Sequence, residues 1–292
     1  MDGRARASGR RHMTAAKMGS PDRNTPNRMI GSRVLGLVLA VALSSPTWAA
    51  SVESEGAVDL ELVIAVDVSS SMSQEEQRVQ REGYVSALRS PDVLRVIKSG
   101  RRGRIAIAYF EWARPEYQRV LVPWTIIDGP ADATSIADAI DGQPAIPQGG
   151  TSISVGLRFA GRLLQTSGLV SDRQVVDVSG DGPNNAGPRV APARDALIAR
   201  GVTINGLVIS LPDGPPDMIQ TFDLPYLESY YRRCVIGGPG AFVLSVGNLG
   251  DFEKAIRHKF IAEIAGPPAR LRLAVHAVQR SLSPALFDCL AP

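Results

Sequence analysis

The stretch "LVIAVDVSSSMSQEE", residues 62–76, decides the fold that the sequence predicts. Its first five residues are aliphatic without interruption, which is typical of a strand buried on both faces of a parallel sheet. The run ends at Asp67, and three serines follow at positions 69–71. Ligands of open α/β sheets bind beyond the carboxyl ends of the strands. An acid and a cluster of hydroxyls at such an end therefore point to a binding site.

Around this stretch, strand-like and helix-like segments alternate, which predicts parallel βαβ units. Only "ARPEY" separates the second and third strands, a gap short enough for an antiparallel hairpin. We expect a doubly wound α/β fold: a mostly parallel central sheet with one antiparallel edge strand and helices on both faces. The predicted strands are 60–68, 104–112, 118–127, 173–180, 202–210 and 240–246, and the predicted helices begin near 74, 135, 152, 189 and 251.

Three polar clusters fall at strand ends or in the loops beside them. Asp67, Ser69 and Ser71 alternate, so their side chains can share one side of an extended segment. Thr151 follows two glycines, and Asp181 lies between two others. Carboxylate and hydroxyl oxygens suit a small divalent cation such as Mg²⁺, which needs few protein ligands because it keeps several waters.

These residues resemble a known family. Asp67-Val68-Ser69-Ser70-Ser71 matches the Asp-x-Ser-x-Ser signature of von Willebrand factor type A (VWA) domains, with Thr151 and Asp181 near the expected later positions. The resemblance covers residues 58–266. Segments such as "VPWTIIDGP", "DVSGDGPNN" and "VIGGPGAFV" are also similar to a bacterial subgroup of exported VWA proteins, DUF1194.

The resemblance implies a metal-ion-dependent adhesion site. The hydroxyls of Ser69, Ser71 and Thr151 would bind the cation, while Asp67 and Asp181 would bind it directly or through water. Mg²⁺ is expected, with Mn²⁺ and Ca²⁺ as alternatives, and an acidic side chain of a protein partner would complete the coordination. This is recognition chemistry, so no catalytic residue is assigned and the protein is not expected to be an enzyme.

One position departs from the family pattern. The second aspartate commonly stands in Thr-Asp-Gly, whereas Gly180 takes the place of the threonine here. Asp177 is a nearby competitor for the role of Asp181. We favour Asp181, because Asp177 falls within a predicted strand.

Other interpretations of the same residues stay open. Ser71 or Ser73 can cap the following helix, and a metal can hold three loops together in a purely structural module. A metal-dependent hydrolase is a third alternative, but a serine nucleophile needs a base. The three histidines, His12, His258 and His276, lie far along the chain from the serines.

The N-terminus predicts export. An arginine precedes an apolar stretch of about ten residues, 34–43, and small residues follow, as in a secretory signal peptide cleaved after Ala49 or Ala50. Such a stretch is too short to span a membrane. We therefore expect an extension and signal peptide over 1–49, translation starting at Met29, a VWA-like domain over 58–266 and a tail over 267–292.

Charge and cysteines complete the expectations. The net charge is +3, but many basic residues precede residue 34 and would leave with the signal peptide. We therefore expect no nucleic-acid partner, and a periplasmic or secreted protein without stable membrane insertion. Cys234 and Cys289 are competent to form a disulfide in an oxidising compartment, and two free thiols are the alternative.

Overall fold

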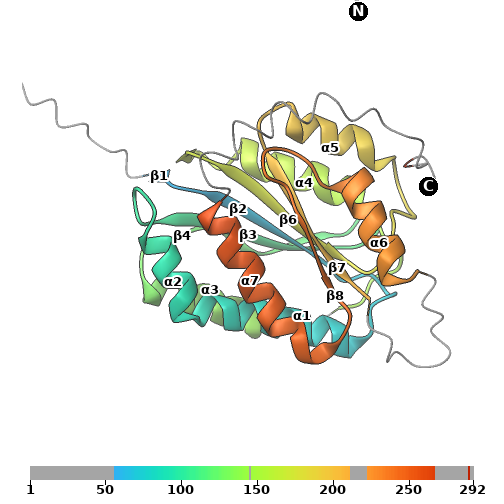
Figure 1. Ribbon diagram of the computed structural model, residues 1–292, viewed down its shortest axis with the longest axis horizontal. Coiled ribbons are helices and arrows are strands. Elements are labelled where there is room, and N and C mark those ends of the chain that lie inside the picture. Colours follow the sequence, from blue (N-terminus) through green and yellow to red (C-terminus); the bar gives the residue numbers. More distant parts are fainter. Residues whose placement is uncertain (1–55, 145, 211–221, 267–288, 290–292) are drawn as a thin grey trace, which may run out of the picture. The chain divides into compact units, whose positions relative to one another are not determined.

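A computed structural model describes residues 56–144, 146–210, 222–266 and 289. Their core is a six-stranded sheet with the strand order β4-β3-β2-β6-β7-β8 (Figure 1). The expected signal peptide and most of the expected tail lie outside the described residues. The strands are β2 (Glu61–Asp67), β3 (Ile105–Trp112), β4 (Gln118–Ile127), β6 (Gln174–Gly180), β7 (Thr203–Ile209) and β8 (Val243–Val246).

The pairing of the strands confirms the predicted fold class. β4 pairs antiparallel with β3 and forms one edge, whereas the other neighbours in the sheet pair parallel. β2 and β6 lie at the centre of the sheet, next to each other. Because they are parallel, Asp67 and Gly180 end their strands at the same edge, which brings two of the predicted polar clusters together.

Helices cover both faces of the sheet (Figure 1). One face carries α1 (Gln74–Arg89), α2 (Pro91–Lys98), α3 (Pro130–Asp141) and α7 (Phe252–Ala265); the other carries α4 (Ile153–Gln165), α5 (Val190–Ile198) and α6 (Leu224–Tyr230) with the π-helical turn η1 (Tyr231–Val235). Strand β2 serves both layers. Ile64 and Val66 pack into the α1 side, whereas Val63 and Ala65 pack into the α4 side. This double burial explains the uninterrupted aliphatic run.

Some elements were not expected from the sequence. Ser90 ends α1 and also caps α2, with its hydroxyl accepting the Asp92 N–H and Pro91 in the first turn. The turn between the two helices is therefore a single residue. A second small sheet pairs β1 (Ala57–Val58) with β5 (Val170–Ser171), and η2 (Leu249–Asp251) precedes α7.

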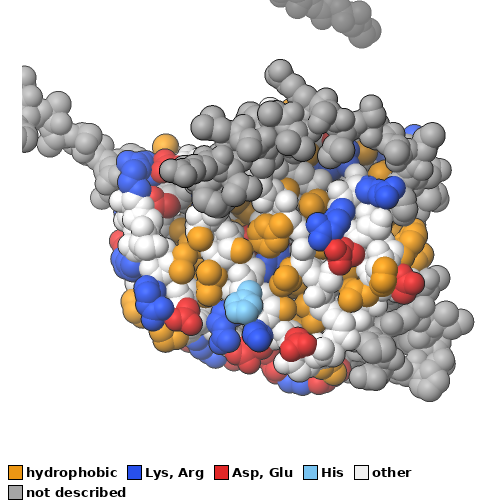
Figure 2. Space-filling view, in the orientation of Figure 1, with side chains coloured by type: hydrophobic (Ala, Val, Ile, Leu, Met, Phe, Trp, Pro, Cys, Tyr) orange, Lys and Arg blue, Asp and Glu red, His pale blue; other side chains and the backbone are white. Residues whose placement is uncertain are grey.

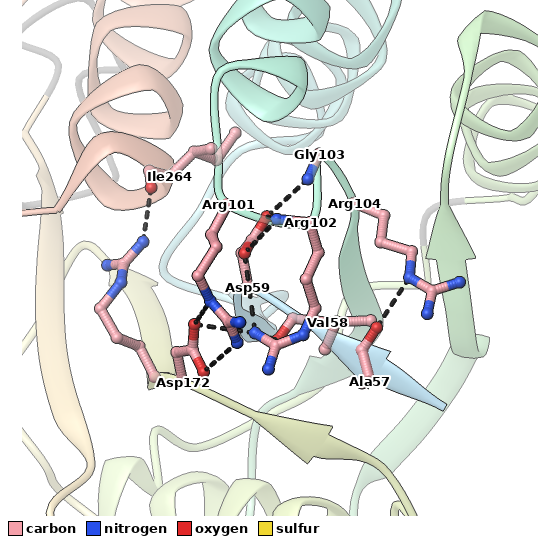
Figure 3. A network of polar contacts seen from close by, with 10 residues as sticks. Ala57, Val58, Asp59, Arg101, Arg102, Gly103, Arg104, Asp172 and Ile264 are labelled. Carbon is pink, nitrogen blue, oxygen red and sulfur yellow. Dashed lines mark hydrogen bonds and ion pairs between the residues drawn. The ribbon is translucent and has the colours of Figure 1, made fainter. Parts of the chain in front are cut away.

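A network of arginines and acids ties the chain together at the edge opposite Asp67 (Figure 3). Asp59 accepts hydrogen bonds from the backbone N–H groups of Arg102 and Gly103. The Arg102 guanidinium lies 2.8 Å from Asp172, whose pKa it lowers. These contacts link the start of β2 to the segments before β3 and β6.

The face of the domain that carries α7 mixes charges of both signs with apolar side chains (Figure 2). Beneath it, α7 packs a buried ion cluster against the sheet. The Lys259 ammonium contacts the carboxylates of Asp177, at 2.5 Å, and Glu263. All three side chains are buried. Asp177 also accepts a hydrogen bond from Tyr84 on α1, so its carboxylate belongs to this cluster.

Cys234 and Cys289 form a disulfide. This settles the pairing that the sequence left open, and it ties the C-terminal end of the chain to η1. Within the described residues, no helix combines the length and apolar character needed to cross a membrane.

Candidate metal centre

Asp67 is a polar group at the carboxyl edge of the sheet and has no exposed surface. Its Oδ1 atom accepts a hydrogen bond of 2.7 Å from the Ser69 N–H. Its Oδ2 atom is buried and has no hydrogen-bond partner among the described residues. A buried acceptor without a partner is costly. The carboxylate therefore has one oxygen whose two lone pairs are open to further partners, a cation among them.

A line of polar atoms continues from Ser69 to Asp181. The Ser69 and Ser71 hydroxyls lie 2.9 Å apart, and the Ser71 hydroxyl donates to Asp181 Oδ1 at 2.8 Å. Four of the five predicted residues are thus close in the structure, although 110 positions separate Ser71 from Asp181.

Helix capping does not account for Ser69 and Ser71. The N-cap of α1 is Ser73, whose hydroxyl accepts the Glu76 N–H while the Glu76 carboxylate accepts the Ser73 N–H. This reciprocal pair is a complete capping box. The hydroxyls of Ser69 and Ser71 point instead to each other and to Asp181.

The loop that carries Thr151 is held on both sides. Gln148 bridges it to the first loop, since its N–H donates to the Val68 carbonyl and its carbonyl accepts the Ser70 N–H. Asn185 bridges it to the third loop, accepting the Thr151 N–H at 2.8 Å and donating its own N–H to the Thr151 carbonyl. The positive φ of 81° at Gly150 permits this turn. Thr151 is buried between the loops that carry Asp67 and Asp181.

Gly180 departs from the family pattern for a steric reason. A Cβ atom at this position would lie 2.5 Å from the Tyr231 hydroxyl and 2.9 Å from Asp67 Oδ2. No side chain fits there without displacing one of them. The side chain of Asp177 lies on the α7 side of β6 and pairs with Lys259. Asp181, by contrast, accepts a hydrogen bond from Ser71.

The electrostatics of the site favour a positive ligand. Burial raises the pKa of Asp67 well above its usual range, and the charge of Asp181 raises it further. Burial also raises the pKa of Asp181 to about 6, with a further contribution from the charge of Glu76. Two carboxylates that lose water and repel each other gain from a nearby cation.

The donor set fits a hard cation with few protein ligands: two carboxylates and three hydroxyls. Among the described residues, no group of three or more His, Cys, Asp or Glu side chains is placed to hold a metal. Sequence reasoning missed Gln148 and Tyr231 as neighbours of the site. Their contacts depend on loop geometry, for which the sequence carries no local signal.

The raised pKa of Asp181 predicts a pH-dependent stability without metal. Between its unfolded value of 3.8 and its folded value of about 6, the folded protein holds the proton more tightly. The free energy of unfolding should therefore fall as pH rises through this window and stay low above it. At pH 8 with chelator, Asp181→Asn should raise the free energy of unfolding by about 1–2 kcal/mol, a shift discounted for partial exposure.

Urea unfolding at pH 4 and pH 8 measures this difference, and Asp195→Asn at an exposed position is the matched control. A gain for Asp181→Asn that is equal at both pH values would contradict the assignment.

Solved structures with a similar fold have different sequences. They include proximal thread matrix protein 1 from the mussel byssus, with a TM-score of 0.51, 18% identity and coverage of 72% of this chain and 49% of that one. The pilus adhesin SpaC of Lactobacillus rhamnosus GG has a TM-score of 0.51, 14% identity and coverage of 71% and 31%. A von Willebrand factor type A protein from Catenulispora acidiphila has a TM-score of 0.49, 16% identity and coverage of 71% of this chain and 43% of that one.

The matched region is less than half of each of these three proteins. At such identities the likeness shows the fold alone. A search of curated proteins finds no match to the chain. A family model does match, over residues 57–268. The chain therefore belongs to the family described as "Protein of unknown function (DUF1194)".

Proposed function

We propose that this protein is an exported VWA domain that binds a divalent cation and uses it to engage an acidic group on a protein partner. Mg²⁺ is the favoured ion, with Mn²⁺ and Ca²⁺ as alternatives. Ser69, Ser71 and Thr151 would bind through their hydroxyls, and the two carboxylates would bind directly or through water. The proposed metal residues are Asp67, Ser69, Ser71, Thr151 and Asp181.

The observation that carries this proposal is the unpaired Oδ2 atom of Asp67. It belongs to a fully buried carboxylate, next to a line of hydroxyls that ends at Asp181. A buried charge persists in a protein when it is paired or coordinates a metal. Within the described part of the chain, no Lys or Arg side chain forms an ion pair with Asp67 or Asp181. A divalent cation would supply the missing positive charge.

Ser71 is exposed whereas Ser69 and Thr151 are buried, so the proposed site opens toward solvent on one side. Mg²⁺ prefers six oxygen ligands and exchanges some of its waters for other oxygens. A carboxylate from a partner protein would match such a position in charge and donor type. Recognition of a protein also accords with the pilus adhesin among the similar folds.

The structural alternative is a metal that only holds the loops together. The loops do not need a metal for this purpose. Backbone and side-chain hydrogen bonds through Gln148 and Asn185 already connect the three loops. The hydrolase alternative has no histidine base in contact with the serines among the described residues. His258, the histidine within the described residues, is exposed on α7, and the hydroxyls of Ser69 and Ser71 contact each other and Asp181.

Export is part of the proposal. The N-terminal sequence indicates a signal peptide, and the disulfide between Cys234 and Cys289 would persist in the periplasm or outside the cell.

Calorimetric titration with Mg²⁺ and Mn²⁺ tests the metal site. The wild type should bind one ion, and Asp67→Ala should weaken binding at least tenfold, about 1.4 kcal/mol, because it removes the buried carboxylate. Asp195→Ala, at an exposed position, should bind as the wild type does. Equal binding by Asp67→Ala and the wild type would remove the site.

A pull-down from envelope extract separates recognition from a structural role. The mature protein should recover a partner in Mg²⁺, lose it in chelator and regain it when Mg²⁺ is restored. Thr151→Ala should recover little partner even in Mg²⁺, which controls for effects of chelator on the extract. Recovery that ignores both the chelator and the substitution would favour the structural module.

A further inference from the structure

The Tyr231 hydroxyl is a second buried polar group near Asp67. Neither Tyr231 Oη nor Asp67 Oδ2 has a hydrogen-bond partner among the described residues. Both contact the same point, the position of a Cβ atom on Gly180, at 2.5 Å and 2.9 Å. A hydroxyl donor and a carboxylate acceptor, each without a partner, therefore both lie next to Gly180.

Two glycines on neighbouring strands make room for this tyrosine. Gly180 on β6 lies beneath the hydroxyl, and a Cβ on Gly206 of β7 would lie 2.9 Å from Cδ1 of the ring. Tyr231 is fully buried. The ring therefore occupies a slot in the sheet surface that side chains larger than hydrogen would close.

The backbone of Tyr231 is fixed independently of the metal residues. It begins the π-helical turn η1, and Cys234 in the same turn is joined to Cys289. π-helical turns are rare and occur often at functional sites. The preceding residue, Tyr230, accepts the Asn184 N–H with its hydroxyl, which links this region to the loop that follows Asp181.

We propose that Tyr231 is a positioning residue of the metal site: its hydroxyl donates a hydrogen bond to Asp67 Oδ2 when Asp67 binds a cation. The inference rests on the proposed function. Asp67 Oδ1 is already fixed by the Ser69 N–H, so a donor to Oδ2 would fix the carboxylate plane. Hydrogen bonds to a site's ligands are often long in the free protein and shorten when the ligand binds.

Tyr231→Phe tests this role because it removes one oxygen and keeps the ring. Loss of a hydrogen bond that orients a metal ligand commonly weakens metal binding ten- to hundredfold. Calorimetry with Mg²⁺ should show about tenfold weaker binding by Tyr231→Phe, while its melting temperature in chelator equals or exceeds that of the wild type. Tyr109→Phe is the matched control: Tyr109 is also buried with an unpaired hydroxyl, but it packs on the α1 side, so Mg²⁺ affinity should not change.

The melting temperature in chelator separates the hydroxyl from ring packing, because Tyr231→Phe keeps the ring in its slot over Gly180 and Gly206. Gly180→Ser should lower the melting temperature, because its Cβ would lie 2.5 Å from Tyr231 Oη and 2.9 Å from Asp67 Oδ2.

The outcomes distinguish this inference from the metal site itself. If the wild type binds Mg²⁺, Asp67→Ala does not, and Tyr231→Phe binds like the wild type, the positioning role is overturned and the metal site stands. Weak Mg²⁺ binding by Tyr231→Phe together with a melting temperature in chelator below that of the wild type would also overturn it, because the loss would then come from ring packing and not from the hydroxyl. If the wild type binds none of Mg²⁺, Mn²⁺ and Ca²⁺, both the proposed function and this inference fail.

Discussion

A carboxylate at the end of the central strand, fully buried and with one unpaired oxygen, is the constraint on which the rest of this structure depends. Asp67 is placed there by β2, a strand buried on both faces. Burial and the nearby Asp181 raise the pKa of Asp67, so the bare site resists ionisation. The same burial makes a cation more effective, because charges attract more strongly where water is excluded.

The surrounding contacts hold this arrangement from several directions. Gln148 and Asn185 join the three loops, and η1 is tied down by a disulfide. At the opposite edge of the sheet, Asp59 and Asp172 connect the strand starts through arginines (Figure 3). Hydrogen bonds beside a metal site, such as those of Gln148 and Asn185, can orient the ligands and tune the affinity for the metal. The three loops are thus held in place by the protein's own hydrogen bonds.

The sequence predicts the sheet, its antiparallel edge and both helical layers, because buried strands and amphipathic helices have local signatures. Ser73 illustrates the limit: sequence allowed either Ser71 or Ser73 to cap α1, and only the fold shows that Ser73 does so. Lys259 and Glu263 read as ordinary polar positions of α7, yet both are buried with Asp177. The threonine missing at Gly180 is explained by Tyr231, about 50 residues later. Such contacts depend on tertiary structure and carry no local pattern.

Crystallography of the mature protein with Mn²⁺, using anomalous scattering to locate the ion, tests the central claim most directly. The account predicts one strong peak at the carboxyl edge of β2, with the hydroxyls of Ser69, Ser71 and Thr151 at about 2 Å. It also predicts that the hydrogen bond from the Ser71 hydroxyl to Asp181 Oδ1, 2.8 Å long in the free protein, is broken when the ion binds. A structure at saturating Mn²⁺ with no peak there, and with the Ser69–Ser71–Asp181 hydrogen bonds unchanged, would contradict it.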